Sequence, residues 1–386
     1  MRVLFVTHAY PRFPADAAGS FLHRLAVALR IADVDVHVLA PSGEGLAPAE
    51  TIEGVPVRRF RYAPRGMESL AYTGTMAEQV LGSIRGKGAL AGLLAAGSFA
   101  VRSAVERLAP DVVHAHWWFP AGLLALGGAG DRPLVTTMHG SDVRLARRVS
   151  LVHPIFRKVM KRSAAVTAVS AWLAGEARAM APDARISIAP MPTDITLFRD
   201  ESANRVAGRF LFVGRLNAQK GLADLLDALA RTPREATLEV IGEGDDGPKL
   251  REQADRLGIA HRVLWRGTVP RSALPAAFRS AQAVMLPSRN EGLGLVAVEA
   301  QLCRTPVIAY DSGGLPEVVS PSWGGTLVTP GDTGALAGAM RTALARPVDD
   351  AARGAAAREH MLQRFAPSAV AASYEGLYRS VMREGR

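Results

Sequence analysis

Residues 287–300 read PSRNEGLGLVAVEA and follow the short apolar run 283–286, which predicts a buried strand. The stretch itself predicts a glycine-rich turn that opens a helix. Free amide groups at a helix N-terminus favour anions, and Gly292 and Gly294 allow the backbone to approach a phosphate closely. The pattern therefore predicts an anion site where a strand passes into a helix.

Two glutamates flank this site. Glu291 precedes the predicted helix and Glu299 lies two turns inside it, so their Cα atoms are roughly 12 Å apart along the axis. Carboxylates beside a phosphate site would repel the ligand, so their presence indicates that they bind hydroxyl groups at opposite ends of a sugar nucleotide. We expect a donor-binding element made of Glu291, Gly292, Leu293, Gly294, Leu295 and Glu299.

A second strand, loop and helix pattern spans residues 210–221, FLFVGRLNAQKG. Arg215 and Lys220 lie where two cations can converge on a diphosphate. A departing nucleoside diphosphate gains negative charge in the transition state, and preorganised cations there lower the barrier. The alternative is a solvated loop with two ordinary cations. We expect both residues to act on the leaving group.

The whole chain of 386 residues alternates short β-branched runs with helical patterns. This alternation is typical of parallel sheets with crossover helices, and the length suits two domains. Predicted strands cover residues 2–6, 34–39, 111–115, 134–138 and 165–169, and then 209–213, 237–241, 263–265, 283–286, 306–308 and 326–328. We expect a domain at 1–195, a second at 196–367, and a C-terminal helix at 368–386 that packs back on the first domain.

The first domain offers polar residues where strands end, which is where open α/β sheets bind ligands. Gly19 and Ser20 precede the predicted helix 21–29, and His116, His139 and Asp142 follow two predicted strands. We expect Gly19 to face a phosphate. Ser20, His139 and Asp142 are candidates for acceptor binding.

A histidine pair at positions 114 and 116 raises the question of a metal site. Because residues at i and i+2 of an extended segment can face opposite sides, we do not expect these two imidazoles to share a metal ion. His116 is instead expected to point into the ligand-binding cleft.

Composition and targeting patterns favour a cytoplasmic protein. Hydrophobic residues make up 48% of the chain and charged residues 21%, as in a well-buried globular protein. The N-terminal apolar stretch is too short for a signal peptide, and the run 89–101 falls short of the roughly 20 residues that a membrane span needs. The single cysteine, Cys303, excludes an intramolecular disulfide and a thiolate zinc cluster, and we expect it in the core.

The formal charge of +10 leaves several partners open. Basic clusters lie at residues 58–61, 144–148 and 157–162. They indicate either a solvated face or attraction to an anionic membrane or acidic substrate. Nucleic acid is not expected, because aromatic residues are only 6% of the chain and no binding-module pattern occurs. The apolar and basic residues 155–162 favour contact with the inner face of a membrane.

Together these elements resemble glycosyltransferase family 4, the retaining GT-B enzymes, over essentially the whole chain. The resemblance rests on the two glutamates at 291 and 299, the segment 214–221, the glycine loop at Gly19 and the segment 306–317. It implies two Rossmann-like domains that face each other across a cleft. It also implies donor-sugar contact by Glu291, ribose contact by Glu299, diphosphate contact by Arg215, Lys220 and Gly19, base contact near Val269, and a position for His116 beside the reacting sugar.

We therefore expect a retaining enzyme that moves a hexose-type sugar from UDP or GDP to an acceptor hydroxyl, without metal or cofactor. The acceptor is a glycan, a lipid-linked sugar or a small molecule, in polysaccharide or glycolipid synthesis. One rival is a nucleotide-cofactor oxidoreductase, because residues 242–247 fit G-x-G-x-x-G, although the acidic residue expected about 20 positions later is missing. The other is a non-catalytic nucleotide-sugar-binding protein.

Overall fold

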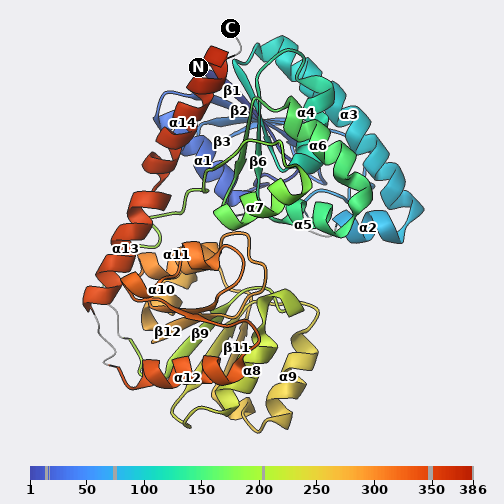
Figure 1. The fold of residues 1–386 in the computed structure, drawn as a ribbon. Coiled ribbons are helices and arrows are strands. Elements are labelled where there is room, and N and C mark those ends of the chain that lie inside the picture. The colour runs from blue at the N-terminus through green and yellow to red at the C-terminus, as the bar shows by residue number, and fades with distance from the viewer. Residues whose placement is uncertain (14–15, 17, 73–75, 202–204, 347–350, 385–386) are drawn as a thin grey trace. The chain divides into compact units, whose positions relative to one another are not determined.

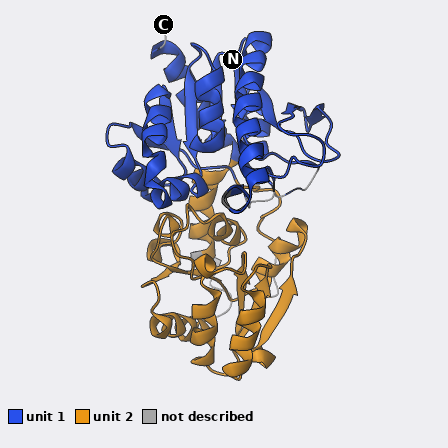
Figure 2. Cartoon of the chain, turned by 90° about the vertical axis from the view of Figure 1, so that its right-hand side faces the viewer, with its two compact units in different colours: residues 1–192, 367–386 blue, residues 193–366 orange. Residues whose placement is uncertain are grey.

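The chain folds into two compact units, shown in different colours in Figure 2. The computed structural model describes residues 1–13, 16, 18–72, 76–201, 205–346 and 351–384. Unit 1 comprises Met1–Pro192 and Pro367–Arg386, and unit 2 comprises Thr193–Ala366. These boundaries lie slightly before the expected ones, which followed residues 195 and 367.

Unit 1 is built on an eight-stranded sheet with the order β3-β4-β2-β1-β5-β6-β7-β8 (Figure 1). Strand β3 runs antiparallel to β4, and the other neighbouring pairs are parallel. The strands are β1 (Arg2–Val6), β2 (Asp35–Pro41), β3 (Ala49–Ile52), β4 (Val55–Phe60), β5 (Val112–His116), β6 (Leu134–Met138), β7 (Ala165–Ala168) and β8 (Ile186–Ile188).

Helices cover both faces of this sheet. They are α1 (Ser20–Ile31), α2 (Met76–Gly82), α3 (Ile84–Leu108), α4 (Leu123–Gly128), α5 (Ser141–Arg148), α6 (His153–Arg162), α7 (Ala171–Met180) and α14 (Pro367–Glu384). Helices α3 and α4 pack on the face that carries Leu4, Val113 and Ala115. The opposite face carries His114, which contacts α14.

The last helix confirms the expected return of the C-terminus to the first domain. Helix α14 packs against α1 and buries Val370, Tyr374, Tyr378 and Val381. The buried hydroxyl of Tyr378 hydrogen-bonds with Nδ1 of His114 in β5, at 2.7 Å.

Helix α3 corrects one expectation from the sequence. The apolar run 89–101 was too short for a membrane span, but it lies within a helix of 25 residues that is long and apolar enough to cross a membrane by length and composition. In unit 1 this helix packs on α4 and contributes Leu93, Val101 and Ala104 to the core. Its apolar residues therefore have a structural role in covering the sheet.

Unit 2 contains a six-stranded parallel sheet with the order β11-β10-β9-β12-β13-β14. Its strands are β9 (Arg209–Val213), β10 (Thr237–Ile241), β11 (Val263–Gly267), β12 (Ala283–Leu286), β13 (Val307–Tyr310) and β14 (Thr326–Val328). Its helices are α8 (Leu222–Ala230), α9 (Gly247–Arg256), α10 (Leu274–Ser280), α11 (Leu295–Leu302), α12 (Thr333–Leu344) and α13 (Ala351–Phe365). The Rossmann-like fold class predicted for both halves is confirmed.

Strand order determines where each sheet can bind a ligand. In unit 2 the strands β10 and β11 are added on one side of β9, and β12, β13 and β14 are then added on the other side. In unit 1 the same reversal falls between β1 and β5. Loops at such a reversal diverge to opposite faces and leave a crevice at the carboxyl ends of the strands. The loops after β9, β12, β1 and β5 are therefore the expected ligand-binding loops.

Three strands of unit 1 were not predicted, namely β3, β4 and β8. Strands β3 and β4 form a hairpin whose turn residues, Glu53 and Gly54, have positive φ angles of 46° and 78°. Strand β4 contains part of the predicted basic cluster 58–61. Arg59 in this strand is buried and donates hydrogen bonds to Glu50 and to the hydroxyl of Tyr72. This arginine therefore belongs to the interior and corrects the expectation of a solvated or ligand-attracting charge.

Candidate active site

The loops that follow β9 and β12 form the unit 2 site. The two strands are neighbours in the sheet, so their carboxyl ends lie side by side. Lys220 follows β9 and Glu291 follows β12, and their side chains form an ion pair with an Nζ–Oε2 distance of 2.6 Å. Arg215 lies in the same loop as Lys220 and is exposed. Two motifs separated by 71 residues in the sequence are thus in contact.

Close backbone packing holds Glu291 in place. At Gly221 (φ 70°) a Cβ atom would lie 2.0 Å from the carbonyl oxygen of Pro287, and at Gly313 one would lie 2.4 Å from the carbonyl oxygen of Glu291. The amide of Gly314 donates a hydrogen bond to the same carbonyl of Glu291, at 2.8 Å. These contacts leave no room for a side chain at positions 221 and 313. The loops after β9, β12 and β13 therefore pack directly on one another's backbones, which fixes their relative positions.

The predicted helix begins later than expected. Helix α11 starts at Leu295, with Gly294 (φ 91°) as its N-terminal capping residue. Gly292 and the buried Leu293 lie in the preceding loop. The helix begins only after Gly294, because the left-handed backbone of this residue is not helical and favours glycine.

Glu299 is buried within α11 and pairs with a cation that the sequence analysis did not identify. Its Oε1 atom lies 2.6 Å from Nη2 of Arg271, and only 6% of its side chain is exposed. The guanidinium of Arg271 also lies over the ring of Phe198, 4.9 Å from its centroid. Arg271 follows β11 and stands two residues after Val269. Its position just after a strand was the available sequence signal.

The glycines at 242 and 244, which suggested a dinucleotide-binding loop, have a packing role. A Cβ atom at Gly242 would lie 1.9 Å from the carbonyl oxygen of Gly214, and one at Gly244 would lie 2.4 Å from that of Leu216. The amide of Leu216 donates to the carbonyl of Glu243 at 3.0 Å. These glycines let the loop after β10 lie against the loop that carries Arg215.

Histidines at three neighbouring strand ends form the unit 1 site. His8 follows β1, His116 ends β5 and His139 follows β6. The Nδ1 atom of His116 lies 3.3 Å from Nε2 of His139, and Trp117 packs between His8 and His139 with ring centroids 4.4 and 4.5 Å away. Among the described residues the buried Nε2 atom of His116 has no hydrogen-bond partner. His116 is fully buried, so this atom is enclosed by protein and leaves one hydrogen-bonding position of the imidazole unused.

The histidine pair in β5 corrects a geometric expectation. His114 and His116 lie on the same face of the strand, with ring centroids 4.0 Å apart, because side chains two residues apart on a strand point to the same side. Both ring nitrogens of His114 are engaged, with the hydroxyls of Tyr378 and Thr137 at 2.7 Å each. Within the described residues no group of three metal-ligating side chains is placed to hold a metal ion.

Burial keeps these imidazoles neutral. It lowers the pKa of His114 to about 3 and that of His8 to about 4. It also lowers the pKa of His116 and His139 well below the ordinary value, with a further decrease from neighbouring histidines. At neutral pH the unit 1 site therefore offers uncharged donors and acceptors, which suit hydroxyl groups better than phosphates.

The two other acceptor candidates differ in what they can do. Asp142 is buried, and its carboxylate accepts hydrogen bonds from the amides of Trp118, His139 and Gly140, at 3.1, 3.2 and 3.0 Å. This corrects the expectation of an acceptor-binding carboxylate, because the group is used to shape the loop that presents His139. Ser20 is the first residue of α1 and is partly exposed.

Gly19 caps α1 in a left-handed conformation, φ 70°. A Cβ atom there would lie 2.4 Å from the carbonyl oxygen of Ala9, so the loop after β1 and the start of α1 touch through backbone atoms. Gly19 is thus placed at the strand reversal of unit 1, beside the loop that carries His8. Sequence analysis did not assign His8, although its position two residues after β1 was a usable signal.

The basic segment at 157–162 is divided between structure and surface. Arg157 donates a hydrogen bond to the carbonyl of Met180 at 2.7 Å. Arg162 donates hydrogen bonds to the carbonyls of Gly130 and Arg132, which lie between α4 and β6. Lys158 and Lys161 are exposed on α6. Beside them, Leu151 and Ile155 are 86% and 43% exposed. This part of α6 is a mixed basic and apolar surface.

Comparisons with known proteins identify the family of the chain. The family models described as Glycosyltransferase Family 4 and Glycosyl transferases group 1 match residues 18–197 and 196–360. The D-inositol 3-phosphate glycosyltransferase of Thermobifida fusca is 30% identical, over 89% of this chain and 85% of that protein. The chain belongs to glycosyltransferase family 4. The glycogen synthase of Mycobacterium tuberculosis (strain H37Rv) is 29% identical, over 100% of this chain and 96% of that protein.

Solved structures show the same fold. Sucrose-phosphate synthase from Thermosynechococcus elongatus superposes with a TM-score of 0.83 over 100% of both chains, at 22% sequence identity. The GT-B fold expected for a family 4 glycosyltransferase is therefore confirmed.

The backbone contact at Gly221 predicts a specific loss of stability. Gly221→Ala must place a methyl group 2.0 Å from a backbone carbonyl, whereas Gly258→Ala has the same positive φ (69°) and open space around it. Gly258→Ala should cost about 1 kcal/mol of unfolding free energy from backbone strain alone, and Gly221→Ala should cost well above that. Denaturant unfolding measures both. Equal losses would contradict the packing argument.

The buried histidines predict a pH dependence of stability. An imidazole whose pKa is lowered on folding resists protonation in the native state, so stability is lost as pH falls below about 6.5. Each such histidine should lower the free energy of unfolding by about 2 kcal/mol between pH 7 and pH 5. His114→Gln should flatten the profile by about one such contribution, measured by denaturation at both pH values.

The exposed His261 supplies the control for this experiment, because His261→Gln should leave the slope unchanged. Parallel profiles for the wild-type protein and His114→Gln would show that His114 is not kept neutral by burial.

Proposed function

We propose that this family 4 glycosyltransferase is a retaining, metal-independent enzyme that moves a hexose-type sugar from UDP or GDP to an acceptor hydroxyl. The contact between Lys220 and Glu291 is the observation that carries the proposal. It brings a cation suited to a diphosphate within 2.6 Å of a carboxylate suited to sugar hydroxyls, at the carboxyl edge of the unit 2 sheet.

Leaving-group stabilisation is the chemistry that these residues supply. As the bond between the anomeric carbon and the diphosphate oxygen breaks, negative charge grows on the diphosphate. Arg215 and Lys220, with the amide groups at the start of α11, stabilise that charge. Lys220 exchanges its contact with Glu291 for the diphosphate, and Glu291 becomes available to bind a hydroxyl of the sugar.

Retention follows from attack on the same face as the departing group. The acceptor oxygen bonds to the anomeric carbon while the diphosphate leaves, and a phosphate oxygen takes the proton of the acceptor hydroxyl. No side chain forms a covalent bond with the sugar. His116, which is neutral and has an unpaired Nε2 atom among the described residues, orients a sugar hydroxyl.

Glu299 and Val269 complete the proposed donor site. The buried carboxylate of Glu299, held by Arg271, accepts hydrogen bonds from the ribose hydroxyls, and the backbone after β11 near Val269 meets the base. A carboxylate fixed by an ion pair loses little freedom when it binds, which favours a rigid ligand group such as ribose.

Ligand-dependent thermal unfolding tests the donor proposal. UDP, GDP and ADP are each added with EDTA and then with magnesium. One uridine or guanosine diphosphate should stabilise the protein by about 2.7 kcal/mol at 100 times its dissociation constant, without metal. Stabilisation by NAD alone would overturn the proposal, and a shift that needs magnesium would overturn metal independence.

The same assay on Glu299→Ala tests the ribose assignment. Losing hydrogen bonds to a charged group should weaken binding by about 1 to 3 kcal/mol. Glu252→Ala, an exposed glutamate of α9, is the matched control and should bind normally.

Nuclear magnetic resonance of the anomeric proton in the product separates retention from inversion. A folded protein that binds the donor and never transfers sugar would instead be a nucleotide-sugar-binding protein.

The acceptor and location form the last part of the proposal. A glycan or lipid-linked acceptor in cell-surface polysaccharide or glycolipid synthesis suits a cytoplasmic enzyme at the inner face of the membrane. Support comes from the exposed Leu151, Ile155, Lys158 and Lys161 around α6, since apolar and basic side chains together favour anionic lipid surfaces.

Vesicle sedimentation tests this membrane contact. Vesicles of phosphatidylcholine with phosphatidylglycerol should retain the protein, and Lys158→Gln with Lys161→Gln should lower the partition coefficient about thirtyfold. Loss of about 1 kcal/mol per lysine is expected near an anionic surface. Equal retention by neutral vesicles, or no effect of the substitutions, would contradict the proposal.

A further inference from the structure

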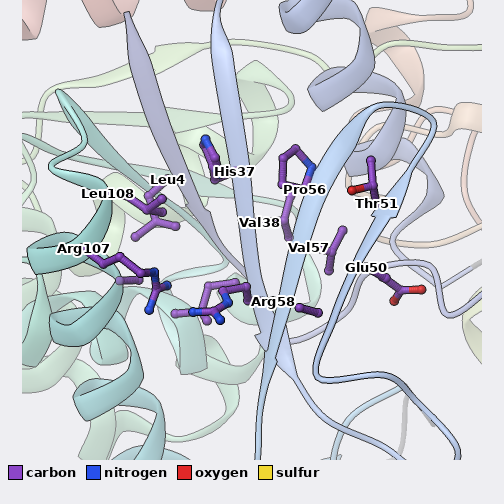
Figure 3. A pocket seen from close by; sticks show the side chains of 13 residues that line it. Leu4, His37, Val38, Glu50, Thr51, Pro56, Val57, Arg58, Arg107 and Leu108 are labelled. Carbon is purple, nitrogen blue, oxygen red and sulfur yellow. The ribbon is translucent and has the colours of Figure 1, made fainter.

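A pocket of about 440 Å³ lies in unit 1, away from the strand ends that carry the histidines. Its floor is the face of the sheet that α3 covers. Strand register places Leu4, His37 and Arg58 on this face, since Leu4 pairs with His37 and Leu39 pairs with Arg58 in adjacent strands. Arg107 and Leu108 at the end of α3 form the opposite wall (Figure 3), and Ala104 also lines the pocket. We call this hollow the α3 pocket.

The pocket lies beside the C-terminal end of α3. Helix α3 stops at Leu108, while the sheet continues outward through the hairpin of β3 and β4. Pro56 and Thr51 of this hairpin line the outer side of the pocket. The result is an apolar floor with polar groups at its rim, of a volume typical of small-molecule sites.

Two arginines dominate the charge of the α3 pocket. Arg58 extends from β4 and Arg107 from α3, and their guanidinium groups point toward the same part of the pocket (Figure 3). Partial burial lowers the pKa of Arg107, and the positive charge of Arg58 lowers it further. In the part of the chain that the structure describes, neither guanidinium has an ion-pair or hydrogen-bond partner.

The other charged groups at the pocket are already engaged. Glu50, which also lines it, pairs with the buried Arg59 at 2.8 Å. Nε2 of His37 lies 3.1 Å from Oδ1 of Asp35, and an imidazole supplies no negative charge to the arginines. Two like charges in one concavity raise its positive potential, because the low-dielectric walls focus the field. An anion in the pocket would remove the repulsion between them.

We propose that the α3 pocket is a second ligand site, which binds the phosphate group of a small phosphorylated molecule between Arg58 and Arg107. Guanidinium groups match phosphate oxygens in shape and charge and can each donate two hydrogen bonds. Leu4 and Leu39 of the floor and Leu108 of the opposite wall take the carbon skeleton of the ligand. The site lies on the helix-covered face of the unit 1 sheet, whereas Arg215 and Lys220 belong to unit 2.

The chemistry is the same for a soluble phosphorylated metabolite and for the headgroup of a phospholipid. Equilibrium dialysis with glycerol 3-phosphate measures the first source, with glycerol as the uncharged control. Sedimentation with phosphatidylcholine vesicles that contain phosphatidic acid measures the second. In both arms the comparison is between the wild-type protein, Arg58→Gln, Arg107→Gln and the double variant.

Each single variant should bind about tenfold more weakly, because a hydrogen bond to a charged group contributes at least a factor of this size. The double variant should lose binding altogether. Arg102→Gln, an exposed arginine of α3 outside the pocket, is the matched control and should bind as the wild-type protein does. Circular dichroism and the unfolding midpoint establish that the variants are folded.

Two outcomes would overturn the proposal. One is that the wild-type protein binds neither probe. The other is that binding survives in the double variant but is lost in Arg215→Gln with Lys220→Gln, which would place the phosphate at the donor site. Dependence on the arginine pair in either arm supports the α3 pocket, and the arm that responds identifies the source of the ligand.

Discussion

Backbone contact between neighbouring loops is the constraint on which the unit 2 site depends. Gly221, Gly242 and Gly313 each stand where a Cβ atom would fall within 2.4 Å of a carbonyl oxygen of the next loop. With no side chains between them, the loops after β9, β10, β12 and β13 lock together through their main chains. The contact between Lys220 and Glu291 therefore follows from the fixed positions of the two loops that contain them.

The sequence predicted the fold well wherever a strand was apolar and followed by a helix. All six strands of unit 2 were placed with errors of at most two residues at their ends. The hairpin of β3 and β4 was missed because its alternating pattern contains Arg58 and Arg59, which suggested a charged surface. One of the three arginines of that cluster is interior: Arg59 is buried through contacts with Glu50 and Tyr72, which lie 9 and 13 residues away. Such long-range partners leave no local pattern.

The site was predictable in outline for a related reason. Polar residues directly after strands, such as Arg215, Glu291, His116 and His139, are brought to a common edge by the parallel topology alone. What could not be predicted was pairing across the sheet. Arg271 reaches Glu299 from the loop after β11, and Asp142 turns inward to bond three amides. Both depend on the register and depth of neighbouring loops, which one segment of sequence does not contain.

The return of α14 to unit 1 has a consequence for biosynthesis. Unit 2 is an insertion in the chain of unit 1, and its two ends meet, since the amide of Thr193 bonds to the carbonyl of Phe365 at 3.0 Å. A ribosome completes all of unit 2 before it reaches Pro367. Until then His114 lacks the hydroxyl of Tyr378, and one face of the larger sheet lacks its last helix. The second unit to be started is thus the first whose sequence is complete, and the nascent protein holds an open apolar surface on unit 1 until α14 has been synthesised.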